Sequence, residues 1–370
     1  MPKRTTKLLQ LWSFKKRSRT RRRPQEKRRR LRAERLEERA MLAVITWTNP
    51  IGGDWSVGSN WNSGAVPGPG DDVVIPDLAG DQTITITSGS HSINRLDASE
   101  TVRLQAGSFS IATTLDSSVG VTLAGGGLQG ATVSSGTTIT VTNASGSSLT
   151  DVVLDGDLDA SQMNNRVSIF GGLELNGTIH VGNEAGNTYG RVYFSEPNSP
   201  AGSLIGTGTI EFGASSFNLI ENDWNQPGVD GTLTIGSGIT IQGAGGSITS
   251  YYGNGSLVNE GTINLSLGDS LNVGGGANSS FSNSGTINVN EGTLGLYGQI
   301  ALSELGTLNR SGGTVELAGT LDLEGGDWNL DASTGSWHRA AGQSRTGRSI
   351  NPTDHCCLPH RQHPLCRTSS

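Results

Sequence analysis

From residue 83 onward, apolar and polar residues alternate in short segments. Five segments place apolar side chains at every second position and are bounded by Gly, Ser or Asn: residues 83–87, 101–105, 108–112, 120–124 and 137–142. A period of two is typical of a β-strand with one buried face. No segment after residue 43 has a convincing helical period, so the pattern predicts an all-β body of short strands.

The tripeptide Gly-Thr-apolar recurs through the second half of this region. One series starts at Gly177, Gly208, Gly231, Gly261, Gly285 and Gly306. Its clearest members are LVNEGTINL, at 257–265, and FSNSGTINV, at 281–289. Repeats of this length are typical of solenoids, in which each strand pairs with its equivalent one coil along, ~4.8 Å away.

The two clearest repeats place matching residues at matching positions of the coil. Their apolar residues are predicted to point inward and their Thr and Asn residues outward. We expect Gly261 and Gly285 at a corner, where the backbone requires positive φ or close packing. Asn259 and Asn283 share one coil position, so their side-chain amides are predicted to hydrogen-bond from coil to coil.

Residues 83–330 therefore predict a β-solenoid of roughly ten coils at about 24 residues each. Two rival interpretations remain open at this point. A β-sandwich fits the irregular spacing between residues 83 and 176. Disorder fits a chain with 33% hydrophobic and 5% aromatic residues and 54 glycines, although the ordered alternation argues against it.

A Trp-rich segment precedes the predicted coils. Trp47, Trp55 and Trp61 lie within fifteen residues, among Gly and Pro that mark turns, and the segment runs on to a strand at 73–75. Because Trp side chains bury a large area, residues 47–82 are predicted to form a small aromatic cluster that caps the solenoid.

Charge divides the chain into three parts. Residues 1–39 hold 17 of the 27 Lys and Arg, whereas residues 40–337 hold five Arg, no Lys and 28 acidic residues, a net charge of −23. The basic segment 1–43 is predicted to be disordered or weakly helical, since 25–42 lacks Gly, Pro and β-branched residues. An acidic body repels phosphate, which argues against nucleic-acid binding there.

Two sets of motifs resemble known families. The apolar-x-Asn-x-Gly-Thr-Ile repeats are similar to those of right-handed parallel β-helix surface proteins of the autotransporter-passenger and filamentous-haemagglutinin type. The segment LEERAMLA, residues 36–43, resembles the motif that opens many large secreted proteins of planctomycete bacteria. The resemblance implies an exported, extracellular or cell-surface, adhesin-like protein that binds glycans, partner proteins or its own copies.

The basic segment has other interpretations as well. An ordinary secretory signal carries an apolar stretch of 7–15 residues, whereas Ala40–Ile45 offers only six. A nucleic-acid-binding or nuclear arm, making the whole protein DNA-associated, is the alternative, and a wrongly assigned start is another. No window approaches the ~18 consecutive apolar residues of a transmembrane helix.

The acidic segment 151–160 is a candidate for a Ca²⁺ site. Asp155, Asp157 and Asp159 are predicted to lie on one strand face, with Leu154 and Leu158 opposite. Neighbouring carboxylates on that face are ~6.6 Å apart, so a Ca²⁺ ion would need oxygens from adjacent coils. The competing interpretation is a solvated acidic face that blunts sideways strand pairing.

Aromatic residues provide candidates for stacking on sugar rings, with buried packing as the alternative. They are Tyr189, Tyr193, Trp224, Tyr251 and Tyr252. Many β-helix proteins cleave polysaccharides, so a hydrolase or lyase is the second functional hypothesis. However, no motif selects a pair of carboxylates, and His91 and His180 have no obvious partner. The sequence therefore assigns neither a catalytic residue nor a cofactor.

The last segment, 338–370, breaks the pattern. Strand alternation stops at Trp337-His338, and HCCLPHRQHPLC gathers three His and all three Cys of the chain within residues 355–366. The spacing of these residues does not match the usual zinc ligand pairs. A shifted reading frame explains the abrupt change, and a natural disordered tail is the alternative.

Overall fold

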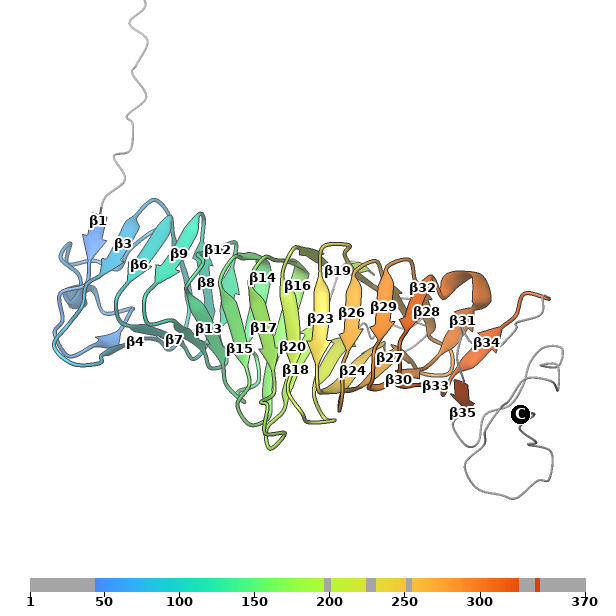
Figure 1. The fold of residues 1–370 in the computed structure, drawn as a ribbon. Helices are drawn as coiled ribbons and strands as arrows, with labels where there is room; N and C mark the ends of the chain where they lie inside the picture. Colours follow the sequence, from blue (N-terminus) through green and yellow to red (C-terminus); the bar gives the residue numbers. More distant parts are fainter. Residues whose placement is uncertain (1–43, 196–200, 224–230, 251–254, 326–336, 340–370) are drawn as a thin grey trace, which may run out of the picture. The chain divides into compact units, whose positions relative to one another are not determined.

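A computed structural model describes residues 44–195, 201–223, 231–250, 255–325 and 337–339 (Figure 1). Contacts divide the chain into Met1–Met41 and Leu42–Ser370, and every described residue belongs to the second unit. The predicted basic segment and nearly all of the tail lie outside the described residues. Within the described ranges, no helix has the length and apolarity needed to cross a bilayer.

The described body is all-β and forms a parallel β-helix, as predicted. Its strand ladders are all parallel, which rules out the β-sandwich, and its two helices are single 3₁₀ turns, Gly58–Asn60 and Leu302–Glu304. Each coil contributes strands to three faces, which follow one another along the chain (Figure 1).

Face 1 is a separate sheet of twelve strands, one from each coil. These strands are β2 (Gly53–Asp54), β4 (Thr83–Ile86), β7 (Thr101–Leu104), β10 (Val121–Leu123), β13 (Thr138–Val141), β15 (Asp157–Ala160), β17 (Thr178–Val181), β20 (Thr209–Phe212), β23 (Thr240–Gly243), β26 (Thr262–Leu265), β29 (Thr286–Val289) and β32 (Thr307–Arg310). The strands predicted at 83–87, 101–105, 120–124 and 137–142 are confirmed on this face.

Face 2 follows face 1 in each coil and includes the strand predicted at 108–112. Its strands are β5 (Ser90–Ile93), β8 (Ser108–Ile111), β11 (Gly127–Gln129), the first parts of β14 (Ser148–Leu154) and β16 (Asn165–Leu175), β18 (Gly190–Phe194), β21 (Leu219–Asn222), β24 (Gly245–Ser250), β27 (Ser270–Gly275), β30 (Thr293–Leu296), β33 (Thr314–Leu317) and β35 (Trp337–Arg339).

Face 3 closes each coil. Its strands are β1 (Val44–Thr46), β3 (Asp72–Ile75), β6 (Arg95–Ala98), β9 (Thr114–Ser117), β12 (Thr132–Val133), the last parts of β14 and β16, β19 (Ala201–Gly206), β22 (Thr232–Ile235), β25 (Ser256–Asn259), β28 (Ser280–Asn283), β31 (Gln299–Ala301) and β34 (Thr320–Asp322). The strands β14 and β16 serve both faces because the chain bends within them, at Asp151 with φ 51° and at Gly171 with φ 78°.

Coil length varies along the chain. Successive register partners on face 1 are Ile84, Val102, Val121, Ile139, Leu158, Ile179, Ile210, Ile241, Ile263, Ile287 and Leu308. These partners delimit ten coils between Ile84 and Leu308, as predicted, and the coil lengths vary around the predicted value of about 24 residues. The shortest coils lie between Ile84 and Leu158, where the repeat motif is absent. In addition, the motif that starts at Gly231 precedes a strand of face 3, not the next strand of face 1.

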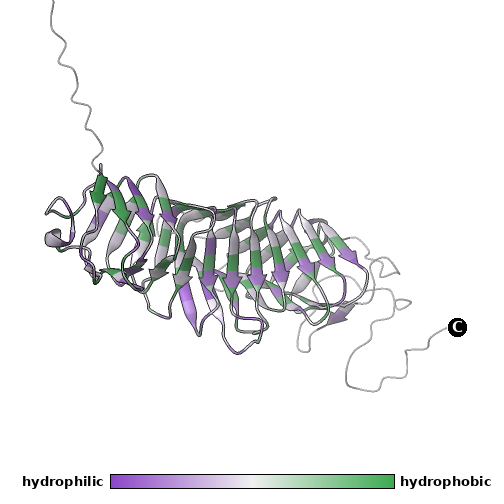
Figure 2. Cartoon of the chain, turned by 60° about the vertical axis from the view of Figure 1, so that its left-hand side comes forward, coloured by the Kyte–Doolittle hydropathy of each residue, from purple (hydrophilic) through white to green (hydrophobic). Residues whose placement is uncertain are grey.

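Apolar residues recur at matching strand positions from coil to coil, seen as aligned hydrophobic bands in Figure 2, and the buried ones form one continuous core. On face 1, one column of Ile, Val and Leu runs from Ile84 to Ile287 and is almost completely buried. A strand of four residues cannot bury its apolar face alone, whereas stacking places each side chain between its equivalents in adjacent coils. Burial of this column therefore holds the coils in register.

The predicted corner residues lie where the repeats placed them. Asn259 and Asn283 are register partners, are buried, and are joined by a hydrogen bond from Nδ2 of Asn259 to Oδ1 of Asn283. A Cβ on Gly261 or Gly285 would lie 2.5 or 2.1 Å from a backbone oxygen of the preceding coil. Close packing, rather than positive φ, therefore requires glycine at both positions.

The Trp-rich segment also packs as predicted. Trp47 and Trp55 both lie edge-on to Trp61, with ring centroids 4.8 and 4.7 Å away. Trp55 also contacts Phe109 of face 2 at 4.9 Å, and all three tryptophans are buried. The cluster therefore covers the first coils with aromatic surface.

Candidate functional site

A row of polar side chains runs along the outer surface of face 1, with one residue from each coil. We call this the outer row: Asp54, Thr85, Arg103, Thr122, Thr140, Asp159, His180, Glu211, Gln242, Asn264, Asn288 and Asn309. Its members are strand-register partners, so neighbours repeat at ~4.8 Å. A parallel row of threonines occupies the first strand position in six consecutive coils, from Thr178 to Thr307.

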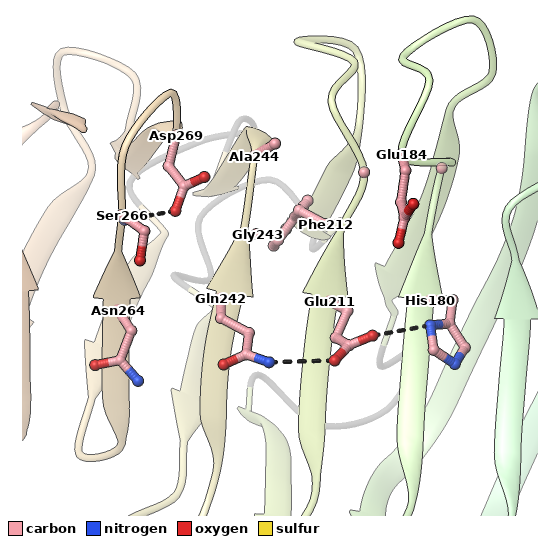
Figure 3. Close-up of a pocket in the computed structure, with 12 residues that line it drawn as sticks. His180, Glu184, Glu211, Phe212, Gln242, Gly243, Ala244, Asn264, Ser266 and Asp269 are labelled. Atoms are coloured by element: carbon pink, nitrogen blue, oxygen red, sulfur yellow. Dashed lines mark hydrogen bonds and ion pairs between the residues drawn. The ribbon is translucent and has the colours of Figure 1, made fainter. Parts of the chain in front are cut away.

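The outer row is linked by side-chain contacts in its second half. Glu211 accepts a hydrogen bond of 3.1 Å from Gln242 and lies 3.2 Å from Nδ1 of His180 (Figure 3). Asn288 donates to Asn264 at 2.8 Å and accepts from Asn309 at 2.9 Å. These contacts hold the planar amide and carboxylate groups in position and reduce the entropy that they would lose on binding a ligand.

A groove of about 550 Å³ opens beside the outer row, across four neighbouring coils (Figure 3). It is lined by His180, Gly182, Glu184, Glu211, Phe212, Gly213, Gln242, Gly243, Ala244, Asn264, Ser266 and Asp269. The lining contains three carboxylates and neither Lys nor Arg. One wall is fixed by Asp269, whose carboxylate accepts a 2.6 Å hydrogen bond from the backbone of Ser266.

The acidic segment 151–160 does not form one strand face, contrary to the sequence prediction. β14 ends at Leu154 and β15 begins at Asp157, so Asp155 lies at the corner between faces 3 and 1. Each carboxylate already accepts a hydrogen bond: Asp155 from Asn176, Asp157 from the Thr178 backbone and Asp159 from the Ser161 backbone. No group of three or more acidic, His or Cys residues in the described ranges has a metal-binding arrangement.

Two of the predicted aromatic residues, Tyr189 and Tyr193, are described by the structure and belong to face 2 or the turn before it. Tyr189 and Tyr193 are half-buried at outward positions around β18, with the outward-facing Arg191 between them. The Tyr189 ring lies 5.7 Å from that of Phe217, which is 66% exposed, and the Arg191 guanidinium lies 5.2 Å from its centre. The other three candidates, Trp224, Tyr251 and Tyr252, lie outside the described residues.

A pair of carboxylates on face 2 was missed from the sequence. Glu221 and Asp223 occupy successive outward positions at the end of β21, yet Glu221 is only 7% exposed. Burial, reinforced by the charge of Asp223, raises the pKa of Glu221 to about 7, while Arg191 acts in the opposite direction. Burial also raises the pKa of Asp223, opposed by a 3.4 Å hydrogen bond from Ser195.

The alternation of residues 219–223 in the sequence already indicates that Glu221 and Asp223 point outward. It gives no sign, however, that an outward residue such as Glu221 is buried. A lone aromatic residue, Phe217, within a Gly/Ala/Ser segment is a signal in the sequence that could have drawn attention to this part of the chain.

Comparison of the chain with protein-family models, with curated proteins and with solved structures gave no match in any of the three.

Proposed function

We propose that the protein is an exported, extracellular or cell-surface protein of adhesin-like type, which holds a polysaccharide chain against face 1. The outer row is the observation that supports this proposal, because it places a polar side chain at the same position of every coil and an amide in four successive coils, from Gln242 to Asn309. A polymer with repeating hydroxyl groups offers a matching series of donors and acceptors. A partner protein, or a second copy of the chain, is the other type of ligand that the resemblance implies.

The chemistry of the groove favours a neutral or cationic glycan. Its three carboxylates accept hydrogen bonds from sugar hydroxyls, and the amides of Gln242 and Asn264 both donate and accept. Glu184, Glu211 and Asp269 would repel an anionic polymer that lay in the groove. Hydrogen bonds to charged acceptors contribute about 1.5–3 kcal/mol each, so several coils acting together suffice for stable binding.

The test is binding of the full chain to immobilised xylan, chitin and β-glucan. The variant Asn264→Leu/Asn288→Leu removes two amides from the outer row, and we expect at least a tenfold loss of affinity. Ser282→Leu provides the matched control, because Ser282 occupies an outward, half-buried position on face 3. Equal binding by the double variant and the control, or no binding to any glycan, would count against the proposal.

A further inference from the structure

The outer side of face 2 has a second set of aligned polar residues, around β18 and β21. Strand register sets Arg191 opposite Leu219 and Tyr193 opposite Glu221. Ser195 lies opposite Asp223 one step further, and its hydroxyl contacts that carboxylate. We call Tyr189, Arg191, Tyr193, Phe217, Glu221 and Asp223 the face-2 patch.

Glu221 is the unusual member of the patch. Its side chain is more than nine-tenths buried, and no donor in the described residues hydrogen-bonds its carboxylate. Burial of a carboxylate disfavours its charged form, and a ligand or a reaction that uses the carboxyl is one explanation for such a group. Asp223 lies two positions on, about 6.6 Å along the strand direction, at the lower end of the ~6.5–9.5 Å separation of inverting glycosidases.

Basic residues on β16 and β18, in the two coils that precede the pair, point to an anionic ligand. Arg166 of β16 and Arg191 of β18 are register partners, and they are two of the five arginines between residues 40 and 337. The Nε atom of Arg191 is buried and has no acceptor among the described residues. A guanidinium group with a free N–H is suited to a carboxylate, and the adjacent rings of Tyr189 and Phe217 offer surfaces for a sugar.

The coil lengths also single out this position. The coils from Ile179 to Ile210 and from Ile210 to Ile241 are the two longest on face 1, and they contain β18 and β21. Part of their extra length lies in the segments 182–189 and 213–218, which lead directly into β18 and β21. Lengthened connections that flank a polar strand surface are a common way to build a site on a regular scaffold.

We propose that the face-2 patch hydrolyses an acidic polysaccharide, with Arg166 and Arg191 binding a uronate carboxylate and Tyr189 and Phe217 contacting the sugar rings. Glu221 donates its proton to the glycosidic oxygen as the bond from that oxygen to the anomeric carbon breaks. Asp223 takes a proton from the water whose oxygen bonds to the same carbon. Each product gains one part of the water molecule, so no other reactant is needed.

The raised pKa of Glu221 supports this division of roles, because the carboxyl then retains a proton close to neutral pH. The activity is separate from glycan binding on face 1. The two proposals require different faces and different polymer charges, so either can fail without the other.

The test is release of reducing ends from polygalacturonate, alginate and hyaluronan by the full chain, with xylan as the neutral comparison. We expect cleavage of an acidic polymer only, and a loss of more than a hundredfold in kcat for Glu221→Gln, as removal of a general acid costs 10²–10⁴-fold. Glu260→Gln is the matched control, because Glu260 is exposed at a corner between faces 3 and 1.

Three results would overturn the proposal: no cleavage of any acidic polymer, full activity in Glu221→Gln, or an unsaturated product, which marks elimination instead of hydrolysis. Circular dichroism of each variant separates loss of chemistry from loss of fold. A pH profile adds a further readout, since activity should fall above the pKa of Glu221 and this fall should be absent from the residual activity of Glu221→Gln.

Discussion

The side-chain amide of Asn259 donates a 2.7 Å hydrogen bond to the amide oxygen of Asn283, one coil further along the helix. Asn283 in turn donates to the carbonyl of Leu305 in the next coil at 2.8 Å. Three successive coils are thus joined through buried side-chain amides at one corner. This arrangement couples neighbouring coils through polar contacts as well as through the core.

Replacement of Asn283 by alanine should destabilise the protein. It removes the acceptor for the buried Asn259 amide, and an unsatisfied buried donor costs about 1–3 kcal/mol. Asn309→Ala is the comparison, because Asn309 donates a similar bond on the exposed outer row and its loss is compensated by water. Urea denaturation of both variants checks the difference, and equal midpoints would refute the role given to the buried amide.

Gly285→Ala should also be destabilising. The added Cβ would lie 2.1 Å from the Gly261 carbonyl oxygen, so the two coils must move apart, at a cost of about 1–3 kcal/mol. Gly70→Ala is the matched control, because no atom lies within 4 Å of the Cβ that this substitution adds. Thermal unfolding should show a lower Tm for the first variant alone.

The Trp cluster predicts an asymmetry between two equivalent substitutions. The indole of Trp61 donates a 2.9 Å hydrogen bond to the Trp55 carbonyl, whereas the buried Trp55 Nε1 has no partner in the described part of the chain. Trp→Phe removes a similar area at either position, but it costs a hydrogen bond only at 61. We expect Trp61→Phe to lose about 1 kcal/mol more stability, measured by chemical denaturation, and the reverse order would contradict this account.

Glu221 should make stability decrease with rising pH. Its pKa is raised from an ordinary value of 4.5 to about 7 in the folded state, so the folded protein binds more protons than the unfolded chain between these values. The contribution of Glu221 to the free energy of unfolding is therefore fully present below pH 4.5. It is lost as the pH rises to about 7. Glu221→Gln should remove that slope and be more stable than the wild type at alkaline pH, and an unchanged slope would exclude Glu221 as its source.

If the protein is exported, residues 1–43 should be absent from its mature form. The basic segment is followed by the first described strand at Val44, so removal of the segment leaves the β-helix intact. N-terminal sequencing of secreted protein is the measurement, and secreted material that begins at Met1 or Pro2 would rule out cleavage.

Most of the fold could be predicted because strand alternation is local. The Gly-Thr-apolar motif, however, marks where a strand begins without specifying its face: Gly261 precedes a face-1 strand, Gly292 a face-2 strand and Gly231 a face-3 strand. Coil lengths read from this motif were therefore partly wrong. The Asn259–Asn283 contact was predictable because two nearly identical repeats contain it.

The face-2 carboxylates could not be found in this way. Glu221 and Asp223 follow the ordinary outward pattern, and the burial that raises their pKa values arises only in the folded chain. Likewise, the outer row depends on the register of twelve strands that are separated by unequal coils. The residue type at each position is visible in the sequence, but the alignment of these residues is not.

The varying length of the coils has a mechanical consequence. Hydrogen bonds between coils run along the stacking axis, so a force that pulls the two ends of the β-helix apart loads the coils in series. Coils would then detach one at a time from an end, each releasing its own length of chain. At ~3.4 Å per residue, that length is about 60 Å for the coil from Ile84 to Val102 and about 105 Å for the coil from Ile179 to Ile210. Under tension the protein would therefore extend in unequal steps, and the order of step sizes would follow the order of coils along the chain.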